Sequence, residues 1–242
     1  MRLEICSNSL ASALIAQEAG AQRIELCTEL GVGGLTPSMG MLQMVREKIT
    51  IPVHVLIRPR AGDFSYSDDE LAIMRTDIQI CKKLGFEGVV SGVLNPDLTV
   101  NLAATSRLID AADGIAFVFH RAIDWVPDPL KTVDDLSELG IKTILSSGQQ
   151  ASAEEGIELL RKMDSRSESC RIMPGGGINA ANVGKFNESG FEYVHMSGAK
   201  NHRTLESDPG VSMFSPSMLK DDEIVVSDPT KIRDVLAALN NS

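Results

Sequence analysis

The sequence contains few aromatic residues, no long apolar run, no excess of positive charge and no dense cysteine pattern. Aromatic residues make up 4% of its 242 positions. No apolar stretch approaches the roughly 20 residues that a transmembrane helix needs, so we expect no membrane partner. The net charge of −10 argues against binding to nucleic acids. The four cysteines lack Cys-x-x-Cys spacing, which favours reduced thiols in a cytoplasmic protein.

The pattern Glu-apolar-Cys occurs twice, at Glu4-Ile5-Cys6 and at Glu25-Leu26-Cys27, with a helical pattern between the two. In a β-strand, residues two apart point to the same face, so each glutamate shares a face with its cysteine. Strand, helix and strand at this spacing predict a βαβ unit with neighbouring parallel strands. Two thiols and two carboxylates then face one interior, where unpaired charge is costly.

A turn signal recurs along the chain, in which a helical pattern ends on glycine and a strand begins two or three residues later. It occurs at Gly20, Gly85, Gly140 and Gly190, where glycine fits a left-handed helix C-cap. The predicted strands are Leu3–Cys6, Arg23–Cys27, Val53–Arg58, Gly88–Gly92, Ala116–His120, Thr143–Ser147, Arg171–Pro174 and Tyr193–Ser197. The predicted helix starts are Thr36-Pro37, Ser67–Glu70, Asp128-Pro129 and Ser152–Glu155, from capping boxes and from proline at the first helical position.

Eight alternations of strand and helix predict a parallel α/β sheet, and eight repeats close a (β/α)8 TIM barrel. A doubly wound open sheet is the alternative. Matching positions in four of the strands favour the barrel, because barrel interiors stack residues from alternate strands in layers of four. We expect one TIM-barrel domain over residues 1–242. A long loop at about residues 200–229 would precede the final helix and serve as a lid or as an oligomer contact.

Active sites of TIM barrels lie at the C-terminal ends of the strands, so we looked there for an anion site. Consecutive glycines in Pro174–Gly177 allow backbone N–H groups to converge, and the following helix N-terminus would add positive charge. Ser197-Gly198 would supply the second half of a phosphate site, although a tight glycine turn explains the run equally simply. Candidate residues for binding the anion or substrate are Arg58, Arg60, Arg121, Ser147, Gly176, Gly177, Ser197 and Gly198.

Proton transfer, if the protein is an enzyme, would fall to Glu25 or His120. For His120 a metal ligand and a satisfied core histidine are the alternatives. A hydrogen bond to Glu25 is the simplest expectation for His195. Glu4 needs a cation inside the barrel, for which Arg23 and the arginines after the third strand are available.

The two cysteines of the repeated pattern allow three interpretations. Neighbouring parallel strands lie about 4.8 Å apart, so the sulfurs of Cys6 and Cys27 could bind Cu(I), which prefers thiolates. A disulfide is feasible in distance but disfavoured in a reducing compartment. Buried cysteines packing as small apolar residues are the third interpretation.

Taken together, these segments resemble the CutC family of copper homeostasis proteins. The resemblance runs from residue 2 to about residue 198. The motifs that carry it are Glu4–Cys6, Arg23–Cys27, Gly33–Pro37, Ile57–Arg60, Gly62–Ser67, Phe119–Arg121, Ser146–Gly148 and Met173–Gly177. It implies a TIM barrel, a cytoplasmic homo-oligomer (a dimer or a tetramer), a role in copper homeostasis, and Cys6 and Cys27 as Cu(I) ligands.

Two functions therefore stay open on the sequence. One is a protein that binds Cu(I) through Cys6 and Cys27. The other is an enzyme that acts on a small phosphorylated or carboxylated metabolite, because an anion cradle, paired arginines and a histidine are not needed to bind a soft metal ion.

Overall fold

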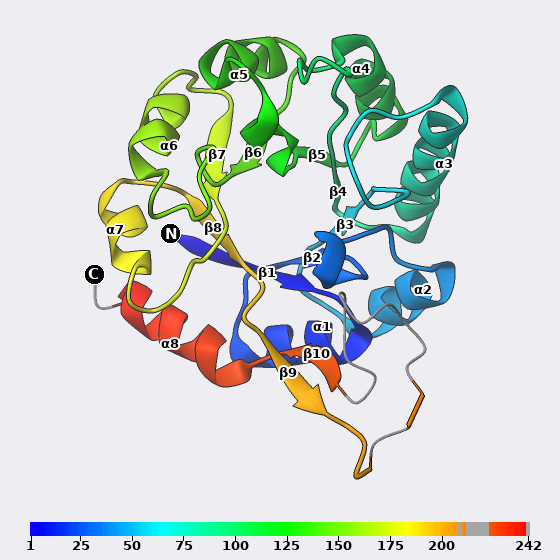
Figure 1. The fold of residues 1–242 in the computed structure, drawn as a ribbon, viewed down its shortest axis with the longest axis vertical. Coiled ribbons are helices and arrows are strands. Elements are labelled where there is room, and N and C mark those ends of the chain that lie inside the picture. Colours follow the sequence, from blue (N-terminus) through cyan, green and yellow to red (C-terminus); the bar gives the residue numbers. More distant parts are fainter. Residues whose placement is uncertain (208–209, 212–222, 241–242) are drawn as a thin grey trace.

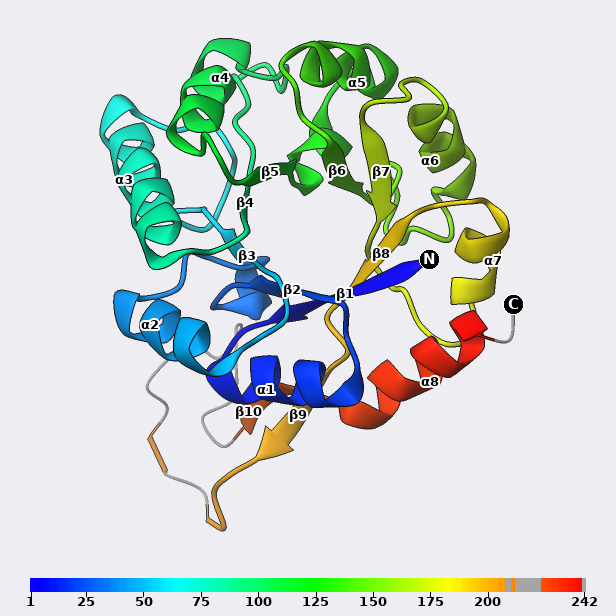
Figure 2. The same ribbon diagram turned by 180° about the vertical axis from the view of Figure 1, so that it is seen from behind.

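The structure, a computed structural model, describes residues 1–207, 210–211 and 223–240. In this part of the chain eight parallel strands form an inner ring, and helices cover its outer face (Figures 1 and 2). The strand order is β7-β6-β5-β4-β3-β2-β1-β8, and a bridge between Gly175 and His195 joins the two ends of the sheet. The predicted TIM barrel is confirmed.

The strands begin and end close to the predicted limits. They are β1 (Arg2–Ser7), β2 (Arg23–Leu26), β3 (Val53–Leu56), β4 (Gly88–Ser91), β5 (Ala116–Phe119), β6 (Thr143–Ser146), β7 (Arg171–Pro174) and β8 (Tyr193–Met196). The α-helices are α1 (Leu10–Ala19), α2 (Met39–Lys48), α3 (Asp68–Leu84), α4 (Leu102–Ala111), α5 (Pro129–Glu138), α6 (Ile157–Asp164), α7 (Val183–Glu188) and α8 (Pro229–Asn240). Two short 3-10 helices are η1 (Leu30–Val32) and η2 (Arg121–Trp125).

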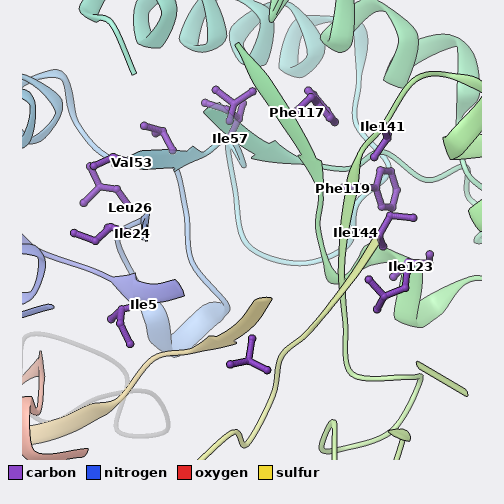
Figure 3. Packing of buried hydrophobic residues seen from close by; sticks show 14 of the residues in the cluster. Ile5, Ile24, Leu26, Val53, Ile57, Phe117, Phe119, Ile123, Ile141 and Ile144 are labelled. Atoms are coloured by element: carbon purple, nitrogen blue, oxygen red, sulfur yellow. The ribbon is translucent and has the colours of Figure 1, made fainter. Parts of the chain in front are cut away.

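The residues of each strand alternate between two cores. One face packs against the helices, as the close view in Figure 3 shows for Ile5, Ile24, Leu26, Val53 and Ile57. The other face fills the barrel interior. Its apolar members are Cys6, Cys27, Leu56, Val90, Val118, Leu145 and Met173. The period of two in the sequence therefore predicted correctly that Cys6 and Cys27 face the interior of the barrel.

Helix starts were predicted less accurately than strands. Ser67 and Asp128 cap α3 and α5 as expected. The predicted start at Thr36 is wrong, because its hydroxyl exchanges hydrogen bonds with the backbone of Arg58, and Ser38 caps α2 instead. The predicted start at Ser152 is also wrong, since the segment first turns to let Ala153 N–H donate to Gly176 O, and α6 begins at Ile157.

The stretch after β8 differs in part from the expected loop. Residues Ala199–Arg203 (β9) and Glu223–Ser227 (β10) pair as antiparallel strands, and β10 leads into α8 (Figure 1). Met213 and Met218, which the expected lid or oligomer contact included, lie outside the described residues. Among the described helices, none combines the length and the apolar character needed to cross a membrane.

Substituting Gly175 tests the closure of the barrel. A Cβ at this position would lie 2.6 Å from Leu145 Cδ1 and 3.2 Å from His195 Cβ. We expect Gly175→Ala to lower the free energy of unfolding by about 1–3 kcal/mol, as overpacking does elsewhere. Denaturant titration measures this change.

Gly184 in α7 provides the control, because a Cβ there would meet no atom within 4 Å. Since alanine favours helix more than glycine, Gly184→Ala should keep the stability or raise it by up to about 1 kcal/mol. Equal stability of Gly175→Ala and the unchanged protein would contradict the steric argument.

Candidate functional site

A cavity of about 760 Å³ opens at the C-terminal ends of the strands. Its walls come from β1, β2, β6 and β8, from the loops that follow β3, β5, β7 and β8, and from α8. The polar and charged residues that line it are Glu25, Arg58, His120, Arg121, Asn179, His195, Ser197, Lys231 and Asp234, together with Cys6.

Glu4 lies below this cavity and is fully buried between Arg23 and His195. Strand pairing sets Glu4 beside Arg23 on one side and beside His195 on the other. The Arg23 Nε–H donates to Glu4 Oε2, and His195 Nδ1 lies 2.8 Å from Glu4 Oε1. Arg23 is thus confirmed as the partner of Glu4. The predicted hydrogen bond between His195 and Glu25 is wrong, because β8 pairs with β1 and the register puts Glu4 opposite His195.

Cys6 lies between a second carboxylate and a second thiol. Its Sγ is 3.5 Å from Glu25 Oε1 and 3.4 Å from Cys27 Sγ, and both thiols are free and buried. Oε2 of Glu25 is buried and has no hydrogen-bond partner among the described residues. One ligand atom each from Cys6, Glu25 and His195 lies within 4.8 Å of the others.

Burial and neighbouring charges shift the protonation of this cluster. Burial alone would raise the pKa of Glu4, but Arg23 and His195 outweigh it and lower that pKa to about 2. Burial would lower the pKa of His195, yet the carboxylates of Glu25 and Glu4 raise it. Burial raises the pKa of Glu25. The hydrogen bond with Cys27 and burial together raise the pKa of Cys6 well above its ordinary value.

Two buried N–H groups in the wall of the cavity have no acceptor among the described residues. His120 Nδ1 accepts the Ala122 N–H at 3.2 Å, so Nε2 carries the ring proton, and Nε2 is unpartnered. Arg58 donates to the carbonyls of Val32, Gly34 and Gly62, which leaves its buried Nε unpartnered. Burial and then Arg58 lower the pKa of His120 to about 3, so this imidazole is neutral at physiological pH.

Another part of the cavity wall combines an arginine with a glycine loop. Arg121 Nε donates to Asp124 and its Nη2 to Ser147, so both contacts fix the guanidinium. Its Nη1 lies beside Gly176, where a Cβ would be 3.6 Å away. The backbone N–H groups of Gly176, Gly177, Ser197 and Gly198 donate no hydrogen bond to any described residue.

The predicted contribution of a helix N-terminus to this loop is wrong. Asn182 accepts from the N–H of Asn179 and donates to Gly177 O, and these bonds hold residues 177–182 in a turn. The helix α7 therefore starts only at Val183, beyond the glycines. Positive charge near the loop comes instead from Arg121 and from Lys231 on α8.

The structure brings most of the predicted site residues to the cavity but leaves three outside. The residues lining it are Cys6, Glu25, Arg58, His120, Arg121, Gly176, Gly177, Ser197 and Gly198. Cys27 lies behind Cys6, and Ser147 hydrogen-bonds to Asp124 rather than facing the cavity. Arg60 forms an ion pair with Glu70 at 2.5 Å and packs on Tyr66, away from the cavity.

Among the charged and aromatic residues that line the cavity, three were not singled out from the sequence. Phe64 packs on His120 with ring centroids 4.7 Å apart and supports the Arg58 guanidinium. Lys231 and Asp234 reach the cavity from α8, which lies on the outside of the barrel between α7 and α1 (Figure 1). Phe64 belongs to the segment Gly62–Ser67 that the family resemblance included, whereas no motif marks Lys231 or Asp234 within an ordinary amphipathic helix.

Comparison with known proteins shows to which family the chain belongs. The model of the CutC family matches residues 1–200, which is most of the chain. The chain belongs to the CutC family. A CutC family protein of Proteus mirabilis is 41% identical over 233 residues, which cover 92% of this chain and 93% of the relative. One of Klebsiella pneumoniae is 46% identical over 216 residues, which cover 87% and 86%.

A solved CutC structure from Streptococcus agalactiae superposes with a TM-score of 0.78 at 33% identity. The match covers 81% of this chain and 98% of that one. The name of that protein assigns it to copper homeostasis. Membership of the CutC family thus connects the chain to copper homeostasis by name.

The neutral His120 of this CutC chain should make folding sensitive to acid. Because the pKa in the folded state is about 3 and the unfolded value is near 6.5, the unfolded chain binds more protons between these limits. The stabilisation is complete above about pH 6.5 and is lost as the pH falls toward 3. We expect the wild type to lose roughly 2–3 kcal/mol more than His120→Gln between about pH 7 and about pH 4.5.

Denaturant titrations at several pH values measure this difference. His202→Gln is the matched control, since His202 is exposed on β9. The same pH slope in wild type and His120→Gln would contradict a buried neutral imidazole.

Proposed function

We propose that the chain binds a small phosphorylated or carboxylated metabolite in the cavity at the C-terminal ends of the strands and acts on it as an enzyme. The observation that carries this proposal is the pair of buried, unpartnered N–H donors on His120 and Arg58 in the cavity wall. Buried donors are almost always satisfied, and leaving one unpaired costs about 1–3 kcal/mol. An anion with several oxygens would satisfy both.

The part of the wall around Arg121 and the glycine loop also favours an anionic ligand. Arg121 Nη1, the free N–H groups of Gly176 and Gly177, and Lys231 provide donors and positive charge on that side. Asp124 and Ser147 hold Arg121 in place before any ligand arrives, which reduces the entropy lost on binding. We assign the anionic group of the ligand to this wall.

Proton transfer in this scheme falls to groups on the floor and side of the cavity. Burial raises the pKa of Glu25, which makes this carboxyl group a better proton acceptor than an exposed one. The neutral His120 would donate its Nε2–H to a ligand oxygen and stabilise charge that develops there. The proposal thus gives His120 the role of a hydrogen-bond donor more than that of a base.

Ligand protection tests the anion site without knowledge of the reaction. We expect inorganic phosphate, a triose phosphate or a small dicarboxylate to raise the melting temperature in a saturable manner. Arg121→Gln and His120→Gln should each weaken that protection by tenfold or more, because each removes a donor to the anion.

Arg60→Gln is the matched control, since Arg60 lies on a neighbouring loop but outside the cavity. It should keep the protection. Absence of protection by all three probes, or equal loss in Arg60→Gln, would overturn the proposal.

A second candidate function is Cu(I) binding by Cys6 and Cys27. The supporting observation is the distance of 3.4 Å between their sulfurs. Two thiols are a donor set that suits a soft monovalent ion, and Cu(I) would displace the thiol protons on binding. Cys6 lies at the cavity, while Cys27 is fully buried behind it, so a copper ion would enter past Cys6.

An anaerobic Cu(I) titration against a chromophoric chelator tests the thiol pair. We expect one Cu(I) ion per chain in the wild type and at least tenfold weaker binding in the Cys6→Ser/Cys27→Ser double variant. Cys81→Ser/Cys170→Ser is the matched control, because these thiols are also buried but belong to the outer core. Equal affinity in the two double variants would reduce the Cys6–Cys27 contact to core packing.

A further inference from the structure

The floor of the cavity brings three different types of metal-ligating side chain close together. The Sγ of Cys6, a carboxylate oxygen of Glu25 and a ring nitrogen of His195 lie within 4.8 Å of one another. Ligand atoms of a tetrahedral zinc ion are about 3.5 Å apart, given bond lengths of about 2.0–2.3 Å. Cys6 Sγ and Glu25 Oε1 already have this separation, at 3.5 Å.

The surroundings of His195 match those of a metal-binding histidine. Its Nδ1 is held by Glu4 Oε1 at 2.8 Å, which leaves Nε2 as the nitrogen that can coordinate an ion. A carboxylate on the second ring nitrogen is the usual outer-shell partner of histidine ligands, because it fixes the orientation of the ring and raises its basicity. Arg23, bonded to the other oxygen of Glu4, holds this carboxylate in turn.

Glu25 provides an independent indication of a missing partner. The residue is 5% exposed and lines the cavity, yet its Oε2 has no hydrogen-bond partner among the described residues. A buried carboxylate oxygen without a donor is costly unless a cation neutralises it. Arg23, which also acts on Glu25, is already bonded to Glu4.

We propose that Cys6, Glu25 and His195 form a binding site for a divalent transition-metal ion such as Zn²⁺, with an open coordination position toward the cavity. Three protein ligands plus one open position are typical of catalytic zinc sites. The proposal does not depend on the anion site, but a ligand oxygen bound near Arg121 could complete the coordination. Glu25 would then serve as a metal ligand, and His120 would remain as the donor to the ligand.

Charge balance favours this site over the thiol pair for a doubly charged ion. A thiolate at Cys6, a carboxylate at Glu25 and a neutral His195 offset the two positive charges of Zn²⁺, while Glu4 and Arg23 neutralise each other. A Cu(I) ion with two thiolates would leave one negative charge beside the Glu25 carboxylate in the same interior. Mixed sulfur, nitrogen and oxygen donors also suit Zn²⁺ better than Cu(I), which prefers sulfur.

An anaerobic titration of reduced, chelator-treated protein with Co²⁺ tests the site. Cobalt reports its own ligands, since coordination by a thiolate gives a charge-transfer band and tetrahedral geometry gives intense visible absorption. We expect one Co²⁺ ion per chain and displacement of that ion by Zn²⁺. The thiolate band should disappear in Cys6→Ser, and affinity should fall by tenfold or more in Glu25→Gln and in His195→Gln.

Cys27→Ser is the matched control and should keep both the band and the affinity. The proposal is overturned if the wild type binds no stoichiometric Co²⁺. It is also overturned if Cys27→Ser abolishes binding while Glu25→Gln and His195→Gln bind as the wild type does, because that pattern belongs to the thiol pair.

Circular dichroism and melting temperature establish that each variant folds. If Cys6→Ser does not fold, two other measurements decide the outcome. They are the Co²⁺ affinities of Glu25→Gln and His195→Gln and the thiolate band of the wild type. Failure of the anion proposal alone would give a different result. Phosphate would then not raise the melting temperature of the wild type, whereas Co²⁺ would still bind.

Discussion

A fully buried carboxylate at position 4 governs the chemistry of the barrel interior. Removing one partner from a buried ion pair costs about 3–5 kcal/mol, so Glu4 requires Arg23 and Arg23 requires Glu4. The pairing of β1 with both β2 and β8 supplies that cation and also fixes His195 on the second oxygen. Once Arg23 neutralises Glu4, the main charge partner that remains for Glu25 is His195. One oxygen of the Glu25 carboxylate is buried and has no hydrogen-bond partner among the described residues.

The CutC family name points to copper, but the site contains much that copper binding does not require. A Cu(I) carrier needs two sulfurs, and the pair formed by Cys6 and Cys27 provides them. It does not explain why Arg121 is fixed beside a glycine loop, or why the buried Nε2–H of His120 lacks a hydrogen-bond partner among the described residues. Homeostasis describes an effect on the cell, and several molecular activities can produce that effect.

Much of the fold was predictable because strands have a simple period. In β1, Leu3 and Ile5 alternate with Glu4 and Cys6, so the first pair faces the helices and the second pair faces the barrel interior. The same alternation assigns apolar residues of the other strands to the two faces. Glycine C-caps such as Gly85 fixed the ends of helices. Starts of helices were harder, because serine and threonine hydroxyls also bond to neighbouring strands, as Thr36 does.

The location of the site was predictable from the sequence, but the hydrogen-bond and ion-pair partners of several of its residues were not. Sequence order indicates which residues lie at the C-terminal ends of the strands, and most of those named line the cavity. The partner of His195 depended on which strand closes the barrel and in which register, and neither is encoded locally. Arg60 has the same local motif as Arg58, yet Glu70 draws its guanidinium away from the cavity. Lys231 arrives from a helix that no motif links to the site.

Cys6 is a ligand in both metal hypotheses, the Cu(I) site with Cys27 and the divalent site with Glu25 and His195. Cu(I) is a soft ion that prefers thiolate ligands, whereas Zn²⁺ also accepts nitrogen and oxygen ligands. Under the proposed assignment, excess copper would displace the resident ion from Cys6 and capture Cys27 as a second sulfur 3.4 Å away. The open position toward the cavity would then be lost along with Glu25 and His195 as ligands. Copper would act on such a protein as an inhibitor, so sensitivity to copper does not require that copper be its cargo.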